Sequence, residues 1–154
     1  DLGCGDGRHA AWLASHGWQV EAVDFSATAI DQAGRRPDAD QARIAWTVAD
    51  ALTWQPTGPV DLVLVAYLHL VDLGTVLAGA LAWLGPSGTL VYLGHALENI
   101  EHGVGGPQEP VVLPTVEQLA AAVGGARVHR LEHVPRETAD GTAVDVLAVV
   151  SPWA

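Results

Sequence analysis

The stretch Asp1-Leu-Gly-Cys-Gly-Asp-Gly7 decides the fold of this chain, because its glycines alternate with other residues immediately before a helical pattern. Glycine at positions 3, 5 and 7 lets the backbone adopt left-handed conformations and approach a ligand closely. The pattern from Arg8 to His16 predicts a helix, whose first N–H groups would be directed at the same spot. The sequence therefore predicts a ligand-binding turn between a strand and a helix.

Two acidic residues follow this turn, each at the end of a predicted strand. Asp24 ends an apolar run over 18–23, 21 positions after Gly3, and Asp50 ends a second run over 43–49. An acid about 20 residues beyond a glycine-rich turn is where dinucleotide-binding folds hold a ribose diol. Asp24 could instead cap the helix that begins near Ser26, and Asp50 could be a solvated loop acid.

Strand and helix patterns alternate along the rest of the chain. Continuous apolar runs over 60–66 and 89–93 suit strands that are buried on both faces of a parallel sheet. Helical spacing over 73–84 and a capping box at 115–118 predict two helices between and after these strands. Alternation over 144–150 predicts a final strand that closes a hairpin. These patterns predict an α/β fold with a doubly wound, mostly parallel sheet and an antiparallel C-terminal hairpin strand.

The composition excludes several classes of protein. The chain has 154 residues, of which 49% are hydrophobic and 16% charged, which predicts one folded domain. A net charge of −11 argues against nucleic-acid partners and acidic membrane surfaces, and no apolar run approaches the roughly 20 residues of a membrane span. Cys4 is the only cysteine, which excludes a disulfide framework and favours a cytoplasmic location. We expect no metal site, because no histidine pair has ligand spacing with an acidic third partner.

These motifs together resemble those of class I S-adenosylmethionine-dependent methyltransferases. The matching segments are, in chain order, Asp1–Gly7, Val23–Ser26, Ala49–Ala51, Val60–Tyr67 and Leu84–Leu90. Arg8 stands where the third glycine of the nicotinamide-binding pattern would be, which disfavours that pattern. Within the family the chain is similar, less specifically, to small single-domain bacterial enzymes of the tellurite-resistance and thiopurine methyltransferase kind.

The resemblance implies a Rossmann-like sheet of seven strands and S-adenosylmethionine as the cofactor, with S-adenosylhomocysteine as its product. In this family the acid of the second motif holds the ribose hydroxyls and the third motif contacts the adenine, which assigns these roles to Asp24 and Asp50. Cys4 lies within the turn and could instead serve there as a small packing residue. The full set of cofactor-binding residues that we expect is Asp1, Gly3, Cys4, Gly5, Asp24, Phe25, Asp50, Ala51 and Ala66.

Three polar residues follow the fourth and fifth motif strands, where the methyl acceptor is expected. Tyr67, His69 and His95 are the predicted catalytic residues, with His95 as the base or the group that orients the acceptor. Each could instead simply finish a strand. The predicted function is methyl transfer to a small-molecule acceptor by in-line displacement. An inactive cofactor-binding module or partner subunit, and a nicotinamide-dependent oxidoreductase, remain alternatives. The oligomeric state stays open, a homodimer included.

The beginning of the chain adds an expectation about its extent. Residue 1 is Asp and the chain contains no Met, while the first motif puts the end of the first strand near residue 2. We therefore expect residues 1–154 to be a single methyltransferase domain that is truncated at its N-terminus and lacks most of its first strand. We also expect this piece not to fold stably alone.

Overall fold

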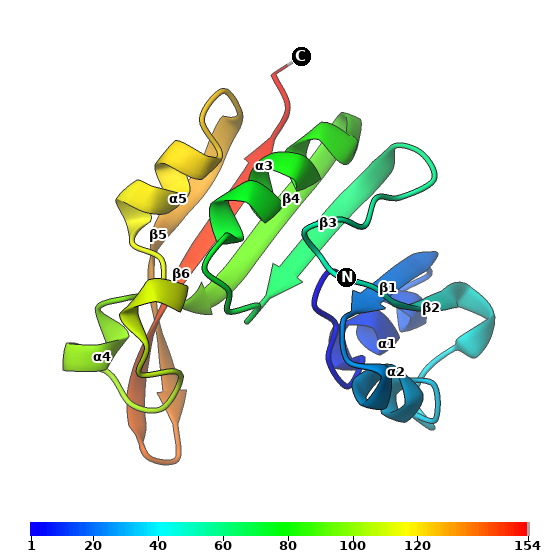
Figure 1. Ribbon diagram of the computed structural model, residues 1–154, viewed down its shortest axis with the longest axis horizontal. Coiled ribbons are helices and arrows are strands. Elements are labelled where there is room, and N and C mark those ends of the chain that lie inside the picture. Colours follow the sequence, from blue (N-terminus) through cyan, green and yellow to red (C-terminus); the bar gives the residue numbers. More distant parts are fainter. Residues whose placement is uncertain (154) are drawn as a thin grey trace. The chain divides into compact units, whose positions relative to one another are not determined.

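The computed structural model describes residues 1–153 and divides the chain into two compact units, residues 1–57 and the chain from residue 58 onward (Figure 1). Each unit has its own sheet and its own helices. The elements of the first unit are α1 (Arg8–Ser15), β1 (Val20–Asp24), α2 (Ala27–Ala33), the 3-10 helix η1 (Gln41–Arg43) and β2 (Ile44–Val48). Those of the second are β3 (Val60–Ala66), α3 (Leu73–Trp83), β4 (Leu84–His95), α4 (Asn99–His102), the 3-10 helix η2 (Pro110–Val112), α5 (Val116–Ala122), β5 (Arg127–Thr138) and β6 (Gly141–Ser151).

The first unit is built on two parallel strands. β1 pairs with β2 from Val20 opposite Ile44 to Asp24 opposite Val48. Leu2 forms a parallel bridge with Val23 on the other side of β1, so the chain before the glycine turn runs along this small sheet. The side chain of Ser26 accepts a hydrogen bond from the backbone of Ala29 and caps α2. The turn and the end of β1 are thereby held side by side.

The second unit contains a mixed four-stranded sheet in the order β3-β4-β6-β5. β3 and β4 are parallel, whereas β6 is antiparallel to both of its neighbours, β4 and β5. α3 packs against β4, α5 packs against β5, and the two helices contact each other. The last strand is therefore inserted between two strands that precede it in sequence, which confirms the predicted antiparallel C-terminal hairpin.

Most predicted elements are present, with two differences. The strand over 60–66 and the capping box of Thr115 and Gln118 are confirmed. The doubly wound, mostly parallel sheet of seven strands is not confirmed, because residues 1–153 form six strands in two separate sheets. Two of the three strand pairings in the second sheet are antiparallel. The Gly-Pro-Ser-Gly sequence over 85–88 is typical of a turn, but it lies within β4 as a bulge, since Val60 is opposite Leu84 but Leu62 is opposite Thr89. Both ends of the bulge stay paired to β3, so the strand continues through it.

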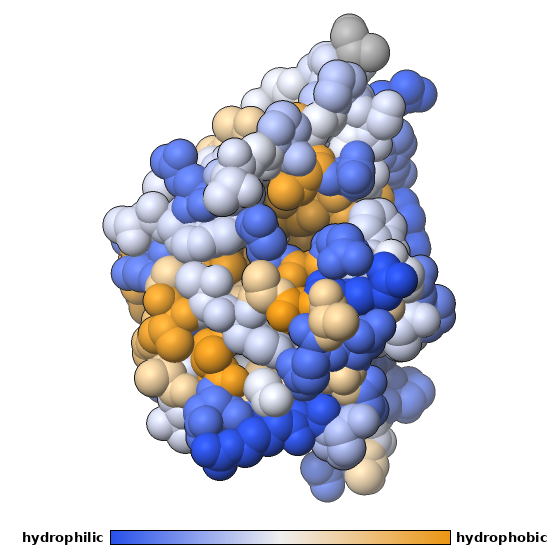
Figure 2. All heavy atoms as spheres, turned by 90° about the vertical axis from the view of Figure 1, so that its right-hand side faces the viewer, coloured by the Kyte–Doolittle hydropathy of each residue, from blue (hydrophilic) through white to orange (hydrophobic). Residues whose placement is uncertain are grey.

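Several large apolar side chains reach the surface in both units. Trp12 and Phe25 of the first unit and Val71 and Val111 of the second are all at least 60% exposed. Figure 2 shows apolar residues at the surface among hydrophilic ones on one face of the molecule. Isolated exposed apolar residues are ordinary in proteins and need no special role. None of the helices within residues 1–153 is long and apolar enough to cross a membrane.

Candidate active site

The glycine-rich turn of the first unit is held by the carboxylate that ends β1. Gly3, Gly5 and Gly7 all have left-handed φ angles, of 75°, 55° and 78°. The backbone N–H of Gly5 donates to Oδ2 of Asp24, and that of Ser26 donates to Oδ1, each at 2.9 Å. Asp24 therefore links the turn to the start of α2. Each carboxylate oxygen has a second lone pair that none of these bonds uses.

The glycines of the turn have different surroundings. A Cβ on Gly7 would lie 2.5 Å from the ring of Trp46 and 2.9 Å from Cβ of Ala33, so Gly7 is required for packing. A Cβ on Gly5 would meet no atom within 4 Å. Both carboxylate oxygens of Asp1 are buried without a hydrogen-bond partner among residues 1–153. Open space at Gly5 and an unpaired buried carboxylate nearby in sequence fit a polar ligand with a cationic group.

The other expected cofactor residues differ in exposure. Cys4 is buried, and burial, with a smaller contribution from Asp24, raises the pKa of its thiol to about 11. Phe25 is 78% exposed directly after Asp24. Asp50 is exposed, and its Oδ1 accepts a hydrogen bond from the backbone of Leu52 at 2.9 Å, which fixes the turn that also contains Ala51. Ala66 belongs to the second unit and is buried at the end of β3.

The three predicted catalytic residues lie together in the second unit. The ring centroid of Tyr67 is 5.4 Å from that of His95 and 6.4 Å from that of His69, and the two imidazoles are stacked at 5.6 Å. Tyr67 is also the one non-glycine residue within 1–153 that has a positive φ, 57°. Such strained residues cost about 1–3 kcal/mol and cluster at functional sites. The sequence thus predicted a group of side chains that the fold assembles.

Asp145 lies at the centre of this group, although sequence reasoning did not select it. The residue is 1% exposed. Tyr67 Oη and Arg136 Nε both donate to its Oδ2 at 2.7 Å. Nδ1 of His95 lies 3.0 Å from its Oδ1, at ion-pair distance but without the alignment of a hydrogen bond. The cluster therefore joins residues from β4, β5, β6 and the end of β3.

Strand register explains why these side chains meet. His95 and Asp145 are directly opposite each other in the antiparallel pairing of β4 with β6. Val134 of β5 is opposite Asp145 on the other side, so Arg136 is its diagonal neighbour. Directly opposite and diagonal side chains on one face of a sheet are within reach of each other. The signal that could have found Asp145 is a charged residue between Val144 and Val146 in an apolar strand.

Electrostatics distinguish the roles open to Tyr67 and His69. Burial, with the hydrogen bond donated to Asp145, raises the pKa of Tyr67 to about 12, so its phenol is neutral near pH 7. Burial, together with neighbouring His95, lowers the pKa of His69, which favours the neutral imidazole. Nε2 of His69 is buried without a hydrogen-bond partner in the described part of the chain. An acceptor with a polar hydrogen or lone pair could satisfy that nitrogen.

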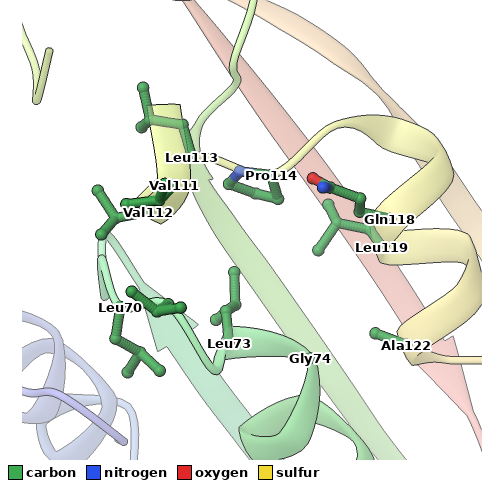
Figure 3. Close-up of a pocket in the computed structure, with 11 residues that line it drawn as sticks. Leu70, Leu73, Gly74, Val111, Val112, Leu113, Pro114, Gln118, Leu119 and Ala122 are labelled. Carbon is green, nitrogen blue, oxygen red and sulfur yellow. The ribbon is translucent and has the colours of Figure 1, made fainter. Parts of the chain in front are cut away.

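A pocket of about 220 Å³, lined mainly by apolar residues, begins one residue after His69 (Figure 3). Leu70 and Leu73 line one side of it, and Val112 and Leu113 of the segment around η2 line another. Gln118 and Ala122 of α5 complete the wall. The long loop before η2 reaches the polar cluster, because a Cβ on Gly106 would lie 2.8 Å from Nε2 of His95. No group of three His, Cys, Asp or Glu residues within 1–153 has the arrangement of a metal site.

Comparisons with known proteins match this chain to methyltransferases. A family model described as a methyltransferase domain matches residues 1–88. An uncharacterized methyltransferase of Mycobacterium tuberculosis is 34% identical over 107 residues, which cover 68% of this chain and 53% of that protein. The chain thus spans about half the length of that curated relative.

Solved methyltransferase structures share the fold. N-methyltransferase NodS of Bradyrhizobium japonicum aligns with a TM-score of 0.74 and 20% identity, over 98% of this chain and 83% of NodS. A putative S-adenosylmethionine-dependent methyltransferase of Listeria monocytogenes aligns with a TM-score of 0.75 and 15% identity, over 100% and 90% of the two chains. This chain belongs to the methyltransferase domain family. The predicted family is therefore confirmed, and the nicotinamide-dependent alternative has no support.

Proposed function

We propose that this chain is the methyltransferase domain of an enzyme that uses S-adenosylmethionine to methylate a small molecule. The main observation in support of this cofactor is the turn of the first unit, which leaves open space at Gly5 beside the carboxylate of Asp24. NodS has also been solved in complex with S-adenosyl-L-homocysteine, at a TM-score of 0.69 and 20% identity to this chain. That relationship supports the same cofactor for this chain.

The residues of the turn fit this cofactor. Asp24 would accept hydrogen bonds from the ribose hydroxyls on its unused lone pairs, and the unpaired carboxylate of Asp1 suits the ammonium of the methionine end. Phe25 offers an exposed ring for the adenine, next to Asp24 in sequence. When bound, the cofactor supplies an electrophilic methyl group on a positively charged sulfur. The remaining members of the proposed set are Gly3, Cys4, Gly5, Asp50, Ala51 and Ala66.

We propose that the second unit binds the acceptor. His95 would accept its proton, the neutral imidazole of His69 would orient it, and Tyr67 would support the site through Asp145. The pocket of about 220 Å³ is below the usual range for drug-sized ligands. Its size and lining support a small acceptor that carries an apolar group. We propose further that residues 1–154 act as one methyltransferase domain, since both units contribute motifs.

Calorimetry with S-adenosylmethionine and S-adenosylhomocysteine tests the cofactor, and the absence of binding to both would refute the proposal. To identify the acceptor, turnover of S-adenosylmethionine is measured with a panel of small hydroxyl, amine and thiol compounds. Ala122→Phe should fill part of the pocket, raise the KM for an accepted compound about tenfold and leave cofactor affinity unchanged. Ala120→Phe, at an exposed position of the same helix, is the matched control. Equal KM values for the two variants would refute the pocket's role.

A further inference from the structure

The buried carboxylate of Asp145 has no role in the proposed function beyond its link to Tyr67. It is 1% exposed and carries a formal charge in the middle of a strand of Val, Ala and Leu residues. Burying a carboxylate costs several kcal/mol unless donors compensate for the lost water. A purely structural position in this strand would be filled more simply by an apolar side chain.

The two oxygens of Asp145 have different partners. Oδ2 accepts from both Tyr67 and Arg136, which uses its two lone pairs. Oδ1 has no hydrogen-bond partner among residues 1–153 and lies 3.0 Å from Nδ1 of His95. Tyr67 and Arg136 thus fix the orientation of the carboxylate so that its second oxygen faces the imidazole.

We propose that Asp145 is a positioning residue that sets the tautomer of His95, with the proton on Nδ1 and the lone pair on Nε2. This inference rests on the proposed function, in which His95 accepts a proton from the acceptor. A carboxylate facing Nδ1 favours the tautomer that carries its hydrogen on that nitrogen. The contact is not aligned as a hydrogen bond, as is common for catalytic pairs before the substrate binds.

The proton balance of the step is simple. The acceptor's X–H bond breaks, its proton moves to the lone pair on Nε2, and the bonding electrons stay on the acceptor atom as its nucleophilic pair. The imidazolium that forms lies beside the carboxylate of Asp145, which stabilises the new charge. His95 later releases the proton to water. Glycine at position 106 lets the loop backbone pack closely against the ring of His95, where a side chain would collide with it.

The first test measures the tautomer directly in the full chain without any ligand. Proteins labelled with 15N at histidine give nitrogen shifts that separate a protonated from an unprotonated ring nitrogen, and the spectrum of His95→Gln assigns the signals of His95. We expect an unprotonated Nε2 and a protonated Nδ1. A dominant Nε2–H form in the wild type would overturn the proposal, and this measurement depends on no Asp145 variant.

The second test is Asp145→Asn. Its amide oxygen can still accept from Arg136 and Tyr67, so its NH₂ group faces Nδ1 and should shift the proton of His95 to Nε2. We expect kcat to fall about 10²- to 10⁴-fold with an accepted compound. Asp61→Asn removes a carboxylate at an exposed position of β3, and should change neither the tautomer nor kcat.

A double-mutant cycle separates positioning from a general structural effect. If Asp145 acts through His95, Asp145→Asn should lower kcat less than about threefold in the His95→Gln background. An equal loss in both backgrounds, or an unchanged tautomer in Asp145→Asn, would overturn the inference. Cofactor binding measured by calorimetry reports on the proposed function alone. The tautomer can be read whether or not the cofactor binds, so the two failures are distinguishable.

Discussion

Asp24→Ala should destabilise the first unit as well as weaken cofactor binding, because the same carboxylate serves both. The change removes the acceptor of two backbone hydrogen bonds, from Gly5 and Ser26, each 2.9 Å long. Hydrogen bonds to charged groups contribute roughly 1.5–3 kcal/mol each. Asp24 is half-buried, so water replaces part of that loss, and we expect a destabilisation of about 2–4 kcal/mol. Loss of the ribose contact should weaken cofactor affinity about 10- to 100-fold.

Two measurements resolve these effects. Hydrogen exchange followed by NMR should show faster exchange of the Gly5 and Ser26 amides in Asp24→Ala, because both lose their acceptor. Calorimetry with S-adenosylhomocysteine gives the change in affinity. Asp24→Asn keeps one acceptor oxygen and should lose about half of the stability that Asp24→Ala loses.

Ser26→Ala is the matched control for this prediction. It removes one capping hydrogen bond, from Ala29 to the Ser26 hydroxyl, and leaves the carboxylate of Asp24 in place. We expect it to cost about 1 kcal/mol and to leave cofactor affinity unchanged. Unchanged amide exchange in Asp24→Ala would refute the structural reasoning. Affinity in Asp24→Ala equal to that in Ser26→Ala would refute the ribose role.

Three further predictions follow from single residues. Gly5→Ala and Gly17→Ala both put a side chain at a left-handed residue with open space, so both should cost about 1 kcal/mol by thermal unfolding, but only Gly5→Ala should weaken cofactor binding in calorimetry. Tyr92→Phe removes a buried hydroxyl without a partner among residues 1–153, and should stabilise the protein by up to about 1 kcal/mol in urea unfolding; a loss above 1 kcal/mol would contradict this. The pKa of Tyr67 is raised to about 12 by burial and its bond to Asp145, so the unfolded phenol ionises first. Stability should therefore fall as the pH rises from about 10 towards 12, and less so in Tyr67→Phe.

Local features of the fold could be predicted because their causes lie within a few residues. The left-handed turn at 3–7 requires glycine. The capping box at Thr115 and the helix cap at Ser26 each join a side chain to a residue three positions further along the chain. The strand over 60–66 is apolar along most of its length and has the predicted bounds. The division into two sheets could not be predicted, since it depends on pairings between strands far apart in sequence.

The candidate acceptor site shows the same limit. Tyr67, His69 and His95 were predicted because each comes shortly after or at the end of a recognisable strand. Asp145 and Arg136 belong to a hairpin whose register with β4 no local pattern specifies. A shift of one residue in that register would turn Asp145 to the opposite face of the sheet. The most buried charge of the cluster was therefore the one that sequence reasoning missed.

The energetic cost of burying the carboxylate of Asp145 favours a role in chemistry over a role in stability. The ion pair between the buried carboxylate of Asp145 and the half-exposed guanidinium of Arg136 offsets the cost of desolvating the carboxylate. Such a pair seldom stabilises a protein more than well-packed apolar side chains at the same place would. Tyr67 adds backbone strain at the same place, with φ at 57°. Replacing Asp145, Arg136 and Tyr67 together by Val, Leu and Phe removes the buried charge along with the two groups that donate to it. The triple variant should unfold at the same or a higher temperature than the wild type, whereas its donor turnover should fall to the level of Asp145→Asn or below. A loss of both stability and turnover would indicate that the cluster mainly supports the fold.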